Sequence, residues 1–374
     1  MKSWASVVIP ELNDSFNFPP ISLTNSKTLK SEVVPKKDTY RMYVCGITPY
    51  DATHLGHAAT YLTFDLIIRY LRASGSEVLY VQNITDIDDP LLERAKRDNI
   101  DWKDLAQSQI DLFRGDMTDL HVIPPKDYIG VVEAMPLVVD AVKKLHQAGT
   151  TYEVGSDIYY RVHSDDEFGR RSHYSEEKML TIFAERGGDP QKVGKENPLD
   201  ALVWLSQREG EPGWPSPFGP GRPGWHIECC AIALHYLQPD SEDEYAIDIQ
   251  GGGTDLIFPH HENEIAQSEA AGYAFAKRWL HNAWVTASGE KMSKSLGNSL
   301  QVHELLKTVR GIELRWYLGS AHYRSMLEFS HEALAESATA FRRIEGFLTR
   351  SVELLGVAPT PVISAAFSDA MNDD

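Results

Sequence analysis

Three strand-like segments each run into residues that could contact a ligand, and this arrangement constrains the fold more than any other feature of the chain. Residues 40–45 and 77–82 flank a helical stretch from about Leu55 to Ala73, which indicates a βαβ unit. A third strand is predicted over 245–250, and three glycines follow it. In a parallel doubly wound sheet, ligands bind beyond the carboxyl ends of the strands. One site could therefore collect the residues that follow all three strands.

The rest of the chain is predicted to be organised around this α/β sheet. Residues 121–215 break the strand–helix pattern and are interpreted as an insertion, whereas a long amphipathic helix is expected over 331–355. The predicted segments are a loosely attached lead-in (1–38), the first half of the catalytic domain (39–120), the insertion (121–215), the second half (216–300) and a C-terminal helical region with a frayed tail (301–374).

Charge and cysteine content narrow the class of protein. A formal net charge of −18 argues against a broad nucleic-acid-binding face. Three cysteines do not make a disulfide framework, and no segment has the length of a membrane span. The N-terminus lacks the apolar core of a signal peptide. A cytoplasmic location without membrane contact is therefore expected.

Two short motifs, far apart in the chain, suit the phosphates of ATP. The first, Thr53-His54-Leu55-Gly56-His57, offers two imidazoles at a predicted helix start, where the helix dipole attracts phosphate. The second, Lys291-Met292-Ser293-Lys294-Ser295, offers two ammonium groups in a Gly/Ser-flanked loop. The alternatives are one buried and one exposed histidine, and a solvated charged turn. Together the motifs favour catalysis by His54, His57, Lys291 and Lys294 at the α-phosphate.

Two thiols and an imidazole form a candidate metal set. Cys45, Cys229 and His260 would make a neutral zinc site with an open fourth position, and Glu264 would lie on the same helical face as His260. The spacing is not that of a zinc finger, and buried cysteines without a metal are common. Cys230 is the alternative to Cys229. Consecutive helical residues point about 100° apart, so only one of the two cysteines is expected to bind the ion.

Several other residues have both a functional and a purely structural interpretation. Trp225 could form one wall of a small-substrate pocket, or it could belong to the hydrophobic core. Thr254 and Asp255 could hydrogen-bond a ribose or cap the next helix. Residues 185–190, with the sequence ERGGDP, would be a plain turn if nothing else were known.

The motifs together resemble the class I cysteinyl-tRNA synthetases. The matching runs are residues 45–51 (CGITPYD), the HLGH motif, residues 221–229 (GRPGWHIEC), residues 258–262 (FPHHE) and KMSKS, in the order of that family. A sister family, the cysteine ligases of mycothiol biosynthesis, is still more similar over residues 47–60 and in the ERGGDP run. The stretch after Ser295 is expected to be too short for an anticodon-binding domain. Residues 261–268 (HENEIAQS) instead resemble the synthetase version, in which the second glutamate is a zinc ligand.

The resemblance implies a Rossmann-like catalytic domain and a two-step reaction. Cysteine and ATP with Mg²⁺ would give cysteinyl-adenylate, and the amine of glucosaminyl-inositol would then take the cysteinyl group. One Zn²⁺, held by Cys45, Cys229 and His260 with Glu264 as the candidate fourth ligand, would bind the substrate thiolate. A monomer is expected, and tRNA is not the expected acceptor; the alternative is a cysteinyl-tRNA synthetase without an anticodon-binding domain. The adenylate contacts that the resemblance implies are Cys45, Gly46, Ile47, Thr48, Thr60, Asn83, Ile84, Thr85, Trp225, Gly253, Thr254, Asp255 and Val285.

Overall fold

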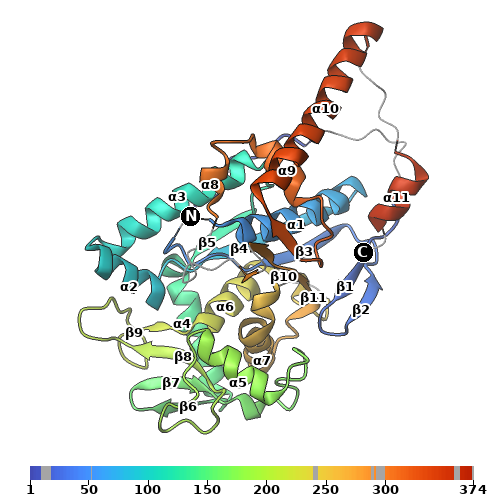
Figure 1. Cartoon of the computed structure of the whole chain (residues 1–374). Coiled ribbons are helices and arrows are strands. Elements are labelled where there is room, and N and C mark those ends of the chain that lie inside the picture. The colour runs from blue at the N-terminus through green and yellow to red at the C-terminus, as the bar shows by residue number, and fades with distance from the viewer. Residues whose placement is uncertain are drawn as a thin grey trace.

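The computed structural model describes residues 1–9, 18–51, 53–238, 243–287, 290–291, 300–357 and 363–372, without the side chains of residues 290 and 291 (Figure 1). Its centre is a five-stranded sheet in the order β11-β10-β3-β4-β5, in which every neighbouring pair is parallel. The strands are β3 (Thr39–Val44), β4 (Glu77–Ile84), β5 (Asp127–Gly130), β10 (Ile247–Gly253) and β11 (Ala276–Asn282). The chain moves outward in one direction from β3 to β5 and returns beside β3 as β10.

Helices cover both faces of this sheet, as in a doubly wound fold. Alternate residues of a strand point to opposite faces, so Met42 packs with one helical layer and Tyr43 with the other. The first layer holds α1 (Leu55–Ala73) and α3 (Trp102–Asp119), and the second holds α4 (Val131–Gln147), α6 (Trp225–Leu237) and α7 (Glu262–Ala270). Burial on both faces fits the mostly buried residues of these strands, which in β10 include the polar Asp248 and Gln250.

The insertion folds as a small antiparallel sheet with a helix, which lies below the parallel sheet in Figure 1. It contains β6 (Thr151–Val154), β7 (Asp157–Tyr160), η1 (Val162–Ser164), α5 (Glu176–Glu185), β8 (Ala201–Ser206) and β9 (Gly221–Pro223). The predicted bounds 121–215 were wrong at both ends: β5 pairs with β4 in the central sheet and α4 covers that sheet, whereas β9 extends the small sheet to residue 223. Only four residues long, β5 gave too weak a pattern to be recognised in the sequence.

The N-terminal residues are not a loosely attached lead-in, contrary to the prediction. Trp4 is buried, and its indole N–H donates to the carbonyl of Val122 at 2.7 Å. Its ring packs edge-on against Phe113 and Tyr128. The hairpin of β1 (Ser22–Asn25) and β2 (Lys30–Val33) lies beside β11, where the backbone N–H of Ser26 donates to the carbonyl of Trp279. The polar composition of residues 1–38 concealed these few apolar anchors.

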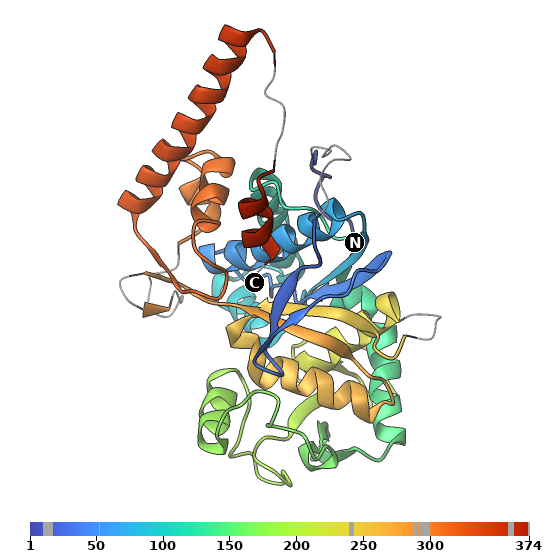
Figure 2. The ribbon, with the colours of Figure 1, turned by 90° about the vertical axis from the view of Figure 1, so that its right-hand side faces the viewer.

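The C-terminal region is helical, as expected. It contains α8 (Val302–Leu305), α9 (Gly311–Leu318), α10 (His331–Leu355), α11 (Ala365–Asn372) and one short strand, β14 (Leu327–Phe329). The strands β12 (Val285–Ala287) and β13 (Glu290–Lys291) precede it, in the predicted second half of the catalytic domain. Figure 2 shows α10 extending away from the rest of the molecule, and α11 replaces the frayed tail that was predicted there. The remaining elements are α2 (Asp89–Asp98), η2 (Thr254–Leu256) and η3 (Ile257–His261). Within the described ranges, no helix is both long and apolar enough to cross a membrane.

Candidate functional site

The candidate site lies where the strand order reverses, at the carboxyl ends of β3 and β10. The backbone N–H of Cys45 donates to the carbonyl of Gly251 at 3.2 Å, and the N–H of Gly46 donates to Asn83 Oδ1 at 2.7 Å. A Cβ atom at Gly46 would lie 1.7 Å from the carbonyl oxygen of Asn83. Only glycine therefore allows the segments after β3 and β4 to meet, and the predicted convergence of the three strand ends is confirmed.

Four buried side chains converge at this edge of the sheet. The ligand atoms of Cys45, Cys229, His260 and Glu264 all lie within 4.8 Å of one another. Glu264 Oε1 is 3.2 Å from His260 Nε2 and 3.5 Å from Cys45 Sγ. Cys230 is not in this group, and its thiol donates to the carbonyl of Glu264 at 3.4 Å. Spacing alone left both adjacent cysteines open, and the structure places Cys229 in the cluster.

A second set of buried polar groups holds these four side chains in place. Gln250 donates from Nε2 to Glu264 Oε2 at 2.9 Å, and His226 Nδ1 lies 3.0 Å from His260 Nδ1. With Nδ1 engaged, His260 presents Nε2 to the cluster. His261 Nε2 lies 3.3 Å from Cys45 Sγ. Partners of this kind fix the orientation of metal ligands in protein sites.

The electrostatics of the cluster pair a thiolate with an imidazolium. Burial alone would raise the pKa of Cys229, but a hydrogen bond from Cys45 and the charge of His260 bring this pKa well below its ordinary range. Burial raises the pKa of Glu264 to about 7. Burial opposes protonation of His260, yet Glu264 and Cys229 raise its pKa to about 10. Cys229 is therefore held as a thiolate, the form that ligates metals.

The first phosphate motif forms the start of α1. His54 is the N-cap residue, and its ring accepts a hydrogen bond from the backbone N–H of His57. The two imidazoles are stacked with centroids 3.7 Å apart. They share one face at the helix N-terminus, as the spacing of three residues predicted. A helix N-terminus with two imidazoles is suited to an anion.

The second phosphate motif approaches the first through its flanking residues. The backbone of Lys291 pairs with Thr286 of β12. After residue 299, Leu300 accepts from the N–H of Leu55, and Val302 donates to the carbonyl of Thr53. The side chain of Lys291 and the whole of Lys294 lie outside the described residues, so their predicted roles stay predictions.

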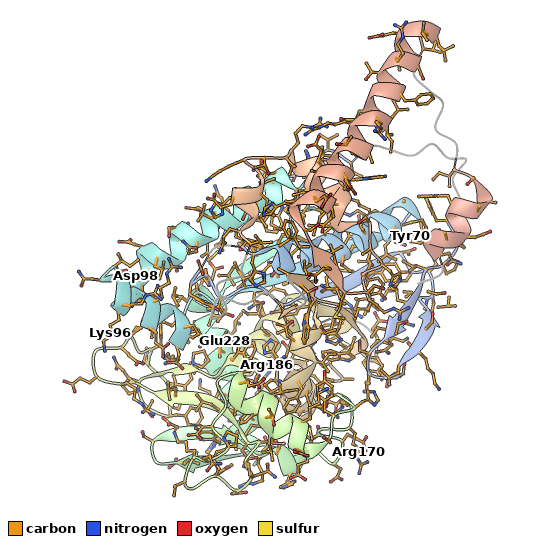
Figure 3. The ribbon with its side chains drawn as sticks, viewed as in Figure 1. Tyr70, Lys96, Asp98, Arg170, Arg186 and Glu228 are labelled. Atoms are coloured by element: carbon orange, nitrogen blue, oxygen red, sulfur yellow. The ribbon has the colours of Figure 1, made fainter. Side chains whose placement is uncertain are left out.

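The remaining predicted adenylate contacts are distributed over several elements. Trp225, the first residue of α6, stacks on His260 with ring centroids 4.4 Å apart. Thr85 donates to Glu228 Oε2 at 3.2 Å, in the buried region where Figure 3 labels Glu228. The other predicted contacts occupy the loop after β3 (Ile47, Thr48), the first half of α1 (Thr60), the end of β4 (Asn83, Ile84) and the end of β10 with η2 (Gly253, Thr254, Asp255).

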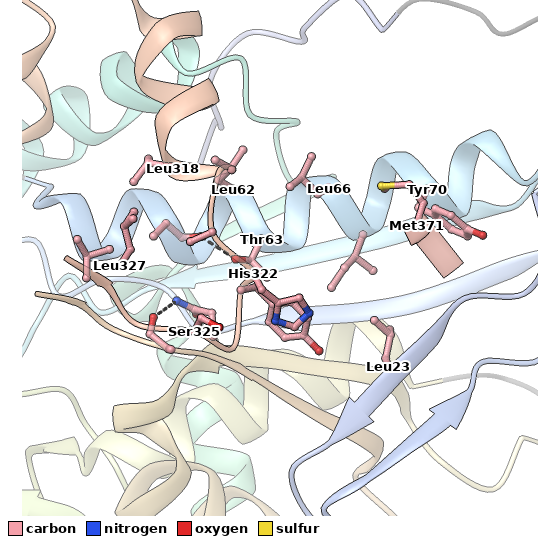
Figure 4. A pocket seen from close by; sticks show the side chains of 18 of the residues that line it. Leu23, Leu62, Thr63, Leu66, Tyr70, Leu318, His322, Ser325, Leu327 and Met371 are labelled. Atoms are coloured by element: carbon pink, nitrogen blue, oxygen red, sulfur yellow. Dashed lines mark hydrogen bonds between the residues drawn. The ribbon is translucent and has the colours of Figure 1, made fainter. Parts of the chain in front are cut away.

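Val285 lies in a different environment, at a cavity of about 240 Å³ that runs along α1 (Figure 4). This cavity is mostly apolar and also contacts β1, the segment 318–327 and Met371 of α11. Val285 is buried beside it. None of the four cluster residues lines the cavity, so it is separate from the candidate metal centre.

Sequence reasoning missed Gln250, His226 and His261 as parts of the site. Their signals were available but weak: Gln250 ends a predicted strand, and the two histidines directly follow Trp225 and His260. Single polar residues of this kind become informative only once the fold places them beside the cluster. α7 begins at Glu262, and His260 lies in η3, the turn that precedes it.

Fold and site together define a catalytic domain of the class I tRNA synthetase type. The family model described as tRNA synthetases class I (C) catalytic domain matches residues 31–339. The fold is similar to that of methionyl-tRNA synthetase from Mycobacterium tuberculosis, with a TM-score of 0.64 and 18% identity over 80% of this chain and 68% of that one.

Comparison with individual proteins identifies a family within the class I synthetase type to which the chain is similar. The chain is 46% identical to the L-cysteine:1D-myo-inositol 2-amino-2-deoxy-alpha-D-glucopyranoside ligase of Thermomonospora curvata, over 100% of this chain and 89% of that protein. It is 49% identical to the ligase of the same name from Kribbella flavida, over 91% of this chain and 84% of that protein. The chain belongs to this ligase family, as its motifs indicated.

Proposed function

We propose that the protein activates L-cysteine with ATP and joins it to the amine of glucosaminyl-inositol. Cysteinyl-adenylate and pyrophosphate would form first, and attack by the amine on the acyl carbon would then release AMP. The observation that carries this proposal is the buried cluster of two thiols, an imidazole and a carboxylate beside the glycines of β10. The names of the relatives support both substrates.

The donor set of the cluster fits zinc. Cys45, Cys229, His260 and Glu264 offer sulfur, nitrogen and oxygen donors of the kinds that ligate Zn²⁺ in proteins. When bound, zinc would supply a soft Lewis acid that prefers a substrate thiolate to a hydroxyl, and so favours cysteine over serine. A pocket that relied on shape alone would separate these isosteres weakly. The chain's own contribution is the buried, hydrogen-bonded arrangement of the four ligands.

The two phosphate motifs would carry the adenylation step. The N-terminal amides of α1 and the stacked rings of His54 and His57 would bind the phosphates, with Mg²⁺ as the counter-ion. Lys291 and Lys294 would stabilise the charge that develops on the α-phosphate. The pairing of residues 53–55 with 300–302 supports joint action, because it brings the flank of the second motif to the first.

The acceptor amine must be neutral before it can attack, and two carboxylates are candidates for removing its proton. Burial raises the pKa of Glu228 well above its ordinary range. Its ionised form, which a base needs, is therefore less accessible than that of an exposed glutamate. Asp255, which follows β10 at the edge of the site, is the second candidate.

One assay tests the proposal. The purified protein should catalyse cysteine-dependent exchange of pyrophosphate into ATP, with serine giving little exchange. With acceptor added, glucosaminyl-inositol should be acylated and tRNA should not. Exchange without acylation of either acceptor would support the adenylation step and refute the proposed transfer step. Transfer to tRNA would identify the protein as a synthetase instead. Absence of cysteine-dependent exchange would overturn the proposed function.

A further inference from the structure

The ERGGDP run of residues 185–190 is more than a plain turn, because it ends α5 in a defined conformation. Gly187 has a φ of +84°, in the left-handed region that favours glycine. The N–H of Gly188 donates to the carbonyl of Phe183 at 2.8 Å, and a Cβ atom at Gly188 would lie 2.4 Å from the Phe183 ring. These features make a Schellman-type helix end that requires both glycines. The helix end fixes the direction in which Arg186 leaves the insertion.

The guanidinium of Arg186 crosses from the insertion to the catalytic domain. Its Nη1 donates to the carbonyl oxygens of Asp255 and Phe258, in the loop that joins β10 to α7. Figure 3 places Arg186 between α5 and the central sheet, whereas Arg170 lies at the outer edge of the insertion. A guanidinium suits this position, because its rigid planar array of N–H groups can bridge neighbouring acceptors.

The same insertion also holds the far end of this loop. Glu262 is buried, and its carboxylate accepts from the N–H groups of Gly169 at 2.9 Å and Ser172 at 2.8 Å. Between the two anchors lies His260, one of the four cluster residues. Hydrogen bonds from the insertion therefore anchor the segment 255–262 at both ends.

We infer that Arg186 is a positioning residue for cysteine activation, acting through the loop of residues 254–261; this inference rests on the proposed function. The loop presents Asp255 to the adenylate and His260 to the cluster. Without the guanidinium, two carbonyls lose a charged donor and the nucleotide side of the loop is released. Glu262 still anchors the metal side. Removal of the guanidinium should therefore weaken ATP binding more than it weakens metal binding.

Three variants separate this role from a general structural one. Arg186→Ala should lower kcat/KM for ATP in cysteine-dependent pyrophosphate exchange by about tenfold or more, mainly through KM, because the loop contacts the nucleotide in ground and transition states alike. Bound zinc per chain should stay unchanged, and amide exchange in residues 254–261 should accelerate. Arg186→Lys should recover part of the activity. Arg170→Ala, in the same insertion, should match the wild type, because Arg170 is 70% exposed and pairs with Glu167.

The outcomes distinguish this inference from the function on which it depends. A wild-type protein without exchange activity would refute the proposed function itself. An active wild type whose Arg186→Ala variant keeps its kinetics and its amide exchange would refute the positioning role. Equal losses in the alanine and lysine variants, accompanied by a large fall in melting temperature, would assign Arg186 to global folding and would also overturn the inference.

Discussion

Glu264 is the residue whose chemistry decides the ligand number of the candidate metal centre. Its carboxylate lies 3.2 Å from His260 Nε2, and Gln250 fixes its other oxygen. If the carboxylate is a ligand, Glu264→Gln should weaken zinc binding by more than about tenfold, because an amide is a much poorer ligand than a carboxylate. Competition with a zinc-binding dye measures this affinity. Unchanged affinity would show that three residues hold the metal and that Glu264 only neutralises charge.

A second residue, Asp116 of α3, makes stability depend on pH. Its carboxyl is buried, and burial raises its pKa from 3.8 to about 7 despite an opposing hydrogen bond from Thr53. The folded state thus holds the proton more tightly than the unfolded chain. The stability that this proton contributes is complete below about pH 4 and is lost as pH rises to about 7.

Asp116→Asn should therefore stabilise the protein increasingly towards high pH. The neutral amide imitates the protonated carboxyl, so the gain in unfolding free energy should be on the order of 2 kcal/mol larger at pH 8 than at pH 5. Urea unfolding at the two pH values measures this difference. The exposed Asp166 offers a matched control, since Asp166→Asn should show no such trend. A gain independent of pH would mean that Asp116 is ionised in the folded protein.

Residue chemistry also explains how much of the site the sequence predicted. The structure brings the predicted Cys45, Cys229 and His260 together, but only the thiols come from a rare residue type, since the chain has three cysteines and 14 histidines. Gln250 was missed because a glutamine at a strand end has no distinctive chemistry of its own. Its function comes entirely from its position beside Glu264, which no spacing in the sequence reveals.

Among the elements, α10 depends on one ion-pair network for its attachment. The side chain of Glu313 in α9 is fully buried and accepts two hydrogen bonds from Arg342 of α10, at 2.6 and 2.9 Å. These bonds lower the pKa of Glu313 to about 2. The contribution to stability is present above the ordinary pKa of a glutamate and is lost only as pH falls towards 2. The network therefore persists at neutral pH.

Arg342→Ala should loosen α10 without unfolding the catalytic domain. Removing the bidentate partner leaves the Glu313 carboxylate with Arg310 alone among these arginines. Amide exchange should accelerate in residues 331–343, whereas exchange in the central sheet should be unchanged. Arg350→Ala is the control, because Arg350 is exposed and pairs with Glu353 on the same helix. Equal exchange in both variants would show that the Arg342–Glu313 pair does not hold α10, which the Arg310–Glu345 pair and apolar contacts would still attach.

Elements with strong local signals were predicted well. The bounds of α1 match the prediction because a cap residue precedes a regular apolar face and Gly75 follows its end. β5 was assigned to the wrong domain because four residues carry little periodicity, and its pairing with β4 is a contact distant in sequence. Local patterns in the sequence thus predicted the elements more reliably than they predicted which sheet a strand joins.

At the scale of the whole molecule, the sequence predicted the parallel sheet and the convergence of its strand ends. It did not predict that the insertion grips the loop after β10. This contact depends on hydrogen bonds from Arg186 to two backbone carbonyls about seventy residues away. The amino-acid sequence does not indicate which backbone carbonyls will accept such bonds. Contacts between a side chain and a distant backbone are thus the least predictable part of this fold.

The candidate metal ligands come from three elements, so metal binding should stabilise the whole catalytic domain. Cys45 follows β3, Cys229 belongs to α6, and His260 precedes α7. A ligand that binds only the folded state stabilises it by about 4 kcal/mol at 1,000 times its dissociation constant. Chelation should therefore lower the melting temperature by roughly 5–10 °C. Added Zn²⁺ should restore it.

The two adjacent cysteines provide the matched pair for this experiment. Cys229→Ala should abolish both the zinc-dependent shift in melting temperature and cysteine-dependent pyrophosphate exchange. Cys230→Ala should keep both, because that thiol lies outside the cluster although it is equally buried. A metal-stripped wild type that keeps its melting temperature and still discriminates cysteine from serine would show that selectivity comes from the pocket and not from zinc.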